Sequence, residues 1–186
     1  MAFDFYNERT DLLNISNLEN GMPGITPKMG ACLAEAAIFC LVSKDHKQGV
    51  LLRLDGECHH NLKLKWRESE NADQCKRTWN DVEVATEYGA YGLAALLIAE
   101  LTDYTVVERS KKGTGFDYWL GKKDAEGQLF QDKARLEVSG IRSGTENEIL
   151  TRVKRKEGQI KRSNGIFPGV IAVVEFSSPR TRFKYR

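Results

Sequence analysis

The chain has 186 residues, of which 41% are hydrophobic and 29% are charged, and its net charge is +2. This length and composition predict one domain with a sizeable core. No apolar run approaches the length of a membrane span, the first residues lack the layout of a signal peptide, and the four cysteines lack framework spacing. We therefore expect a reduced, cytoplasmic protein without membrane contact.

Basic residues are concentrated in the last part of the chain. Residues 151–186 contain ten Lys or Arg and two Glu, a balance of +8, whereas residues 1–150 carry a balance of −6. Such asymmetry predicts a surface near the C-terminus that faces a polyanion. A solvated helix face followed by a basic tail would give the same pattern.

The first part of the chain predicts a helix and a hairpin. Residues 1–28 are rich in turn-forming residues, and residues 28–46 have the Ala- and Leu-rich composition of a helix. Two short apolar runs, 49–54 and 62–66, flank a polar turn and predict a β-hairpin. The polar stretch 67–77 is expected to be a loop or a linker.

The second part of the chain alternates between helical and extended patterns. A long apolar helix is expected first, with Asn80 or Asp81 as its cap, and a shorter helix with an acidic first turn follows three strands. The order helix, three strands, helix, strand predicts an α/β fold with a mixed central sheet flanked by helices. The expected ranges are 78–101, 104–109, 116–121, 134–141, 143–162 and 169–176.

Two of the expected strands each carry one acid among large apolar residues. Because strand side chains alternate, Glu137 and Ser139 share one face of their strand. In the preceding strand, Asp117 is expected on the face opposite Phe116 and Tyr118. Carboxylates on neighbouring strands can hold a hard divalent cation, although two exposed acids on a half-solvated sheet would look the same.

A lysine interrupts the apolar stripe of the last helix. At 100° per residue, Ile149, Val153 and Ile160 form one stripe, Lys156 lies within it, and Gln159 lies at its edge. A buried ammonium group without a partner is costly, so Lys156 is expected to meet a carboxylate. The alternative is a lysine that extends its amine to solvent from the edge of the stripe.

The long helix carries a similar polar exception. Glu87 shares a face with Tyr91 and Ile98, which places a carboxylate on an apolar surface in need of a cation. The helix is apolar nearly all round, however, so any acid on it would touch apolar neighbours. Glu83, one turn earlier, is an alternative.

A helical Glu, a strand Asp, a strand Glu and a helix with Lys and Gln, in this order, resemble the PD-(D/E)XK nuclease superfamily. The resemblance covers roughly residues 81–177, which would form the core of a single nuclease-like domain, 1–186. Residues 1–80 would be an N-terminal elaboration with the helix and hairpin, and residues 178–186 would be a basic tail.

The resemblance implies a role for each of these polar residues. Asp117 matches the first acid of the motif, Glu137 matches the second, and Glu87 matches a helical acid that completes the metal shell. The motif has lysine two residues after its second acid, where this chain has Ser139. Some members place that lysine on the following helix, which Lys156 fits. The implied catalytic set is Asp117, Glu137, Lys156 and Gln159.

The resemblance implies a metal-dependent endonuclease that cleaves phosphodiester bonds in DNA, favoured over RNA, with Mg²⁺ or Mn²⁺ as cofactor. It also implies work in bacterial (antiviral) defence or DNA repair alongside other protein subunits. Arg180, Arg182 and Lys184 are expected to contact phosphates. Two alternatives remain: a catalytically inactive nuclease-like subunit that binds nucleic acid or protein, and a small-molecule- or nucleotide-binding protein with an unrelated α/β fold.

Overall fold

The computed structural model describes residue 5 and residues 11–69, 71–123, 133–161 and 167–186. This part of the chain contains both helices and strands. In chain order they are β1 (Leu12–Asn14), the 3-10 helix η1 (Ile15–Asn20), α1 (Pro27–Val42), β2 (Leu51–Gly56), β3 (His60–Lys65), α2 (Ala72–Thr78), α3 (Val82–Leu101), β4 (Tyr104–Arg109), β5 (Tyr118–Lys122), β6 (Ala134–Ile141), α4 (Glu146–Lys161), β7 (Gly169–Glu175) and β8 (Arg180–Tyr185).

All eight described strands join one mixed sheet in the order β1-β3-β2-β8-β7-β6-β5-β4. Strands β4, β5 and β6 form an antiparallel meander, and α4 then connects β6 to its parallel neighbour β7. Parallel neighbours require such a crossover connection. The predicted α/β fold with a mixed sheet and flanking helices is therefore confirmed.

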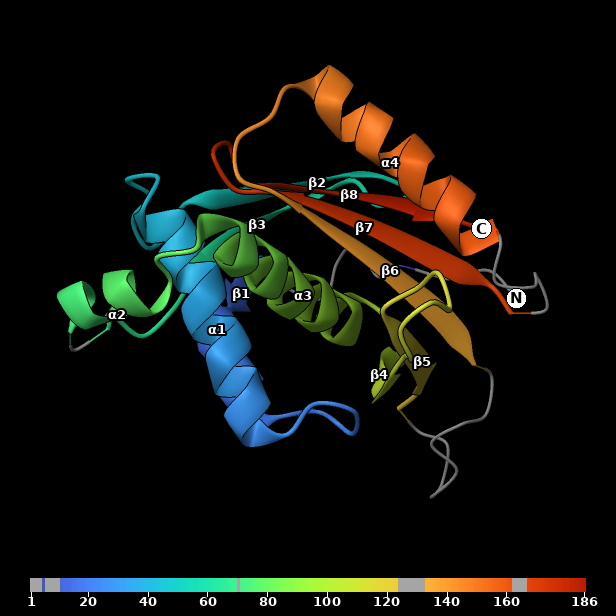
Figure 1. Ribbon diagram of the computed structural model, residues 1–186, viewed down its shortest axis with the longest axis horizontal. Coiled ribbons are helices and arrows are strands. Elements are labelled where there is room, and N and C mark those ends of the chain that lie inside the picture. Colours follow the sequence, from blue (N-terminus) through green and yellow to red (C-terminus); the bar gives the residue numbers. More distant parts are fainter. Residues whose placement is uncertain (1–4, 6–10, 70, 124–132, 162–166) are drawn as a thin grey trace.

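Helices cover the two faces of the sheet unequally (Figure 1). Helices α1 and α3 pack on one face over the larger hydrophobic core, and α4 lies alone on the other face. The predicted stripe of α4 is confirmed, because Ile149, Val153 and Ile160 are buried against Ile171 and Val173 of β7. Lys156 lies within this stripe and is therefore directed at the sheet.

The N-terminal part contains three described elements that the sequence did not predict. Strand β1 pairs in parallel with β3, η1 follows it directly, and α2 occupies most of the stretch expected to be a loop or linker. Helix α2 begins after Asn71, whose side chain accepts a hydrogen bond from the Gln74 amide at 3.0 Å. That cap, with Asp73 in the first turn and basic residues in the last, stabilises a helix in a polar sequence.

The expected basic tail is a strand of the sheet. Strand β8 lies between β2, to which it is parallel, and β7, to which it is antiparallel. Phe183 is fully buried on the α1 and α3 side, whereas Arg180, Arg182 and Lys184 alternate with it and lie on the α4 side. The hairpin β2–β3 thereby continues the same sheet as the predicted core.

The chain bends at Asp117, immediately before β5 begins. The expectation that Phe116 and Tyr118 share one face is wrong because this bend reorients the chain. Phe116 packs on the α4 side against Trp119, with ring centroids 4.7 Å apart, and Tyr118 packs on the α3 side against Tyr91 at 5.6 Å. The Asp117 side chain is thus placed at the end of a strand, where both faces of the sheet can reach it.

Helix α3 is the most apolar described helix of the chain. Contrary to the expectation from sequence, its 20 residues include an 18-residue stretch with a mean hydropathy of 1.2, which is long and apolar enough to cross a membrane. However, 67% of this 18-residue stretch is buried inside the fold. This burial is typical of the core helix of a soluble protein.

Candidate functional site

Backbone contacts hold Asp117 beside β6. Its amide donates to the carbonyl of Leu136 at 2.9 Å, and its Oδ2 accepts a hydrogen bond from the amide of Val138 at 2.7 Å. The side chain therefore takes the place of a backbone partner where the ladder between β5 and β6 ends. One carboxylate oxygen is held in the line of the ladder, and the second remains available to other groups.

Glu137 meets Asp117 at this point. Glu137 is only 4% exposed and lies on the α4 side, and its carboxyl group is close enough to that of Asp117 for the negative charge there to act on it. Nζ of Lys156 donates a hydrogen bond to Oε1 of Glu137 from the stripe of α4, where the lysine side chain is 15% exposed. The structure thus brings together three residues that the sequence predicted for one site.

The carboxyl of Glu137 is harder to ionise than an exposed one. Burial, and then the negative charge of Asp117, raise the pKa of Glu137 to about 7, although the hydrogen bond and charge of Lys156 act in the opposite direction. One lysine therefore does not balance the two carboxyl groups. An additional cation beside them would lower this pKa.

Glu87 reaches the site through an intermediary. The hydroxyl of Tyr91 donates to Oε1 of Glu87 at 2.6 Å and lies 3.2 Å from Oδ1 of Asp117. Burial, and then the hydrogen bond to Glu87, raise the pKa of Tyr91, which keeps the phenol neutral and able to donate. From the sequence, Tyr91 is only one residue of an apolar face, and its spacing of four residues from Glu87 is the signal that could have identified it.

A glycine allows α3 to approach the sheet closely enough for this contact. A Cβ atom at Gly140 would lie 2.5 Å from the backbone oxygen of Thr86, closer than any side chain tolerates. Thr86 directly precedes Glu87 on α3. The small residue on β6 therefore helps to bring the α3 side chains to Asp117.

Ser139, two residues after Glu137, contacts a basic residue of α4. Ser139 is buried on the same face as Glu137, and its hydroxyl accepts a hydrogen bond from Nη1 of Arg152 at 2.9 Å. Arg152 lies one turn before Lys156 on α4. The sequence reasoning missed Arg152, although its spacing from Lys156 placed both cations on one side of the helix.

The remaining predicted residues lie apart from the two carboxyl groups. Oε1 of Gln159 is buried without a hydrogen-bond partner among the described residues, so Gln159 is not hydrogen-bonded through this oxygen to Lys156. The three basic residues of β8 already have acidic partners. These pairs are Arg180 and Arg182 with Glu146 at the start of α4 and with Asp55 of β2, and Lys184 with Glu57.

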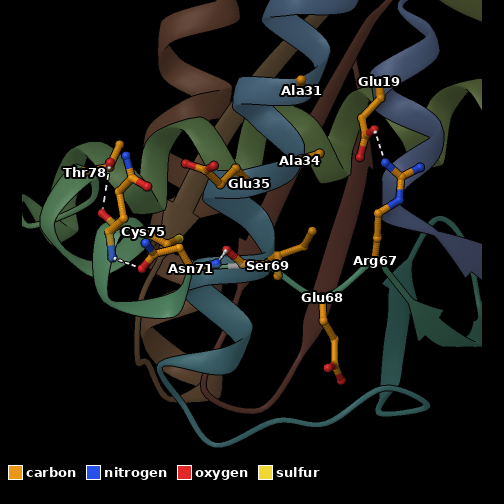
Figure 2. Close-up of a pocket in the computed structure, with 12 residues that line it drawn as sticks. Glu19, Ala31, Ala34, Glu35, Arg67, Glu68, Ser69, Asn71, Cys75 and Thr78 are labelled. Carbon is orange, nitrogen blue, oxygen red and sulfur yellow. Dashed lines mark hydrogen bonds and ion pairs between the residues drawn. The ribbon is translucent and has the colours of Figure 1, made fainter.

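A separate hollow lies between α1, η1, α2 and the segment after β3 (Figure 2). Its volume is about 510 Å³, and it shares no lining residue with the carboxyl pair. Several of its polar groups serve local contacts: Arg67 binds Glu19, Asn71 caps α2, and Glu35 accepts a hydrogen bond from Trp79 at 2.7 Å. This hollow therefore offers no set of groups that converge on one ligand atom.

Comparisons with known proteins assign no function to the chain, so a functional assignment depends on the residues of the site. No family model matches the chain, and no curated protein or solved structure matches it. Among the described residues, no group of three or more His, Cys, Asp or Glu side chains is arranged to hold a metal ion. Two carboxylates nevertheless fit Mg²⁺, which proteins usually bind through one or two carboxylates together with waters and substrate phosphates.

Proposed function

We propose that this protein is a metal-dependent phosphodiesterase of the nuclease type, with DNA favoured over RNA as its substrate. The observation that carries the proposal is the close approach of the carboxyl groups of Asp117 and Glu137, which come from neighbouring segments at the end of the ladder between β5 and β6. The sequence resemblance supports the same pair as metal ligands.

The charge balance of the site favours a bound divalent cation. Asp117, Glu137 and Glu87 supply three carboxyl groups, whereas Lys156 is the one amine in contact with them among the described residues. Asp117 and Glu137 would hold Mg²⁺ or Mn²⁺, which supplies polarisation of the phosphate and a lower pKa for a bound water. A cation there offsets the repulsion between the two acids.

The chain's own groups have distinct roles in this proposal. Lys156 neutralises negative charge that develops on the phosphate oxygens or orients the attacking water. Tyr91 fixes the second oxygen of Asp117 and links it to Glu87 on the surface of α3. Glu137 is enclosed by α4, which limits the access of bulk water and strengthens electrostatic interactions at that carboxyl group.

A cleavage assay on single- and double-stranded DNA and RNA with Mg²⁺ or Mn²⁺ tests the proposal. Wild type should cleave, Glu137→Gln should abolish cleavage, and Lys156→Met should lower kcat by about 10²–10³-fold. Lys154→Met is the matched control, because Lys154 is exposed on the same helix. This variant should cleave as well as wild type. If the wild-type protein cleaves no substrate with either metal, the proposal that it is an enzyme is wrong.

A catalytically silent binding subunit is the second candidate, and one observation favours it. Lys156 forms a direct ion pair with Glu137, and Asp117 accepts a hydrogen bond from a backbone amide. These charged groups therefore already have partners within the protein. In that case Lys156→Met lowers the melting temperature, and divalent cations shift it in neither wild type nor Glu137→Gln. Under the enzyme proposal, Mg²⁺ or Mn²⁺ raises the melting temperature of wild type alone.

A further inference from the structure

Two cations of α4 make parallel contacts with two residues of β6. Lys156 binds Glu137, and Arg152, one helical turn earlier, binds Ser139, two strand residues later. Residues two apart on a strand face the same way and are separated by about 6.6 Å. The guanidinium of Arg152 is thus fixed one strand repeat from Glu137, on the same side of the sheet.

No carboxylate among the described residues balances the charge of Arg152. Its Nη1 donates to the neutral hydroxyl of Ser139 and, at 3.5 Å, to the carbonyl of Gly140, and no ion pair joins it to an acid in the part of the chain that the structure describes. Arg180 and Arg182 differ in this respect, since each contacts two carboxylates.

Partial burial makes this lack of a counter-ion costly. Arg152 is half-buried, and burial, together with the charge of Arg155, lowers its pKa. A guanidinium group has five N–H donors in a planar fork, and among the described residues only Nη1 of Arg152 finds acceptors. The free donors suit the oxygens of a phosphate, which the fork can bind in pairs.

We propose that Arg152, held by Ser139, is a phosphate-binding residue that receives a backbone phosphate of the nucleic acid next to the carboxyl pair. This inference rests on the proposed function for the identity of its ligand as nucleic acid. It assigns to the site a cation that contacts substrate, in addition to Lys156, which contacts a carboxylate. Ser139 acts as a positioning residue because it fixes one edge of the guanidinium.

Equilibrium binding of fluorescein-labelled DNA oligonucleotides, measured by fluorescence anisotropy in the presence of a chelator, tests this role independently of cleavage. Arg152→Gln should weaken binding about tenfold to a hundredfold, as expected for a lost hydrogen bond to a charged group. The slope of log K against log salt should also fall by about one. Arg155→Gln removes the same charge from an exposed position of α4 and should weaken binding less than about twofold.

Two further variants separate binding from folding. Arg152→Lys keeps the charge and the stem but loses the fork, and it should bind with an intermediate affinity. Ser139→Ala should weaken binding by a smaller factor than Arg152→Gln. A melting curve of each variant identifies any that fails to fold, and Arg152→Lys then carries the comparison.

The outcomes distinguish this inference from the proposed function. Equal effects of Arg152→Gln and Arg155→Gln, or no effect of either, would overturn the assignment of Arg152. Wild type that binds no oligonucleotide at low salt would overturn it as well. If binding depends on Arg152 while no metal supports cleavage, the phosphate site stands and the protein is a binding subunit.

Discussion

The two faces of the sheet differ in the kind of residue that they bury. On the side of α1 and α3, the core is apolar and extends along most of the sheet. On the side of α4, the apolar cluster is small and lies beside charged groups. Every buried charged residue that the structure describes faces this second side: Asp55, Arg135, Glu137 and Glu175.

This difference assigns separate tasks to the two faces. Burial of apolar surface stabilises a fold without regard to pH or salt, whereas a buried charge is stable only with a partner. Glu137 has Lys156 as its partner, and Glu175 accepts hydrogen bonds from Ser177 and Ser178. The first face therefore supplies stability, and the second face holds groups whose ionisation a ligand can change.

The largest expected effect is a truncation on the apolar side. Leu33→Ala removes a fully buried side chain of α1 and should lower the free energy of unfolding by about 2–5 kcal/mol. The loss should be the same at pH 5 and pH 8, because no ionisable group is involved. Denaturant titration measures it, with Leu51→Ala as the control, since Leu51 is 54% exposed and should cost little. A loss that changes with pH would contradict the division between the faces.

The second effect is a pH dependence confined to the α4 side. Since the pKa of Glu137 is raised to about 7 in the folded protein, the unfolded chain releases this proton first as pH rises. Stability from this group is therefore complete at pH values below its unfolded pKa and is lost as pH rises towards about 7.

Thermal or chemical unfolding of wild type and Glu137→Gln, without divalent cations, measures this term. The stability of wild type relative to the variant should fall by on the order of 3 kcal/mol between about pH 4.5 and pH 7.5. Mg²⁺ should reduce the fall if it binds the carboxylate. A difference that stays constant over this range would show that the two states ionise Glu137 alike.

The smallest expected effect lies where the two faces meet. Tyr91→Phe removes the hydroxyl that links Glu87 to Asp117 and should lower the free energy of unfolding by about 1 kcal/mol, because Glu87 is exposed and solvent replaces the bond. Tyr88→Phe, on the same helix, is the control and should change stability less. If the two variants behave alike, the hydroxyl of Tyr91 does not couple the faces.

The sequence predicted the features that depend only on which residues share a face of a helix or strand. The stripe of α4 identified Lys156 as a buried cation, and alternation in β6 placed Glu137 and Ser139 on one face; the structure has both. These features depend only on the helical and extended repeats of 3.6 and two residues. The cap of α3 is Asp81, one of the two residues predicted for it, because the signal of a cap is local.

Features that depend on distant contacts could not be predicted in this way. The bend at Asp117 is stabilised by hydrogen bonds to β6, and the position of β8 depends on pairing with β2 from the first half of the chain. The contact of Arg152 with Ser139 requires the angle at which α4 crosses the sheet. None of these leaves a periodic signal in the sequence.

The central position of β8 has a consequence for how the chain folds during synthesis. Every other described strand leaves the ribosome before β8, yet β2 and β7 have no neighbour on their inner edges until β8 arrives. The nascent protein therefore exposes two open strand edges, which are prone to pair with other chains. Closure of the sheet joins β8 to β2 from the first half of the chain, so we expect this step of folding to be slow.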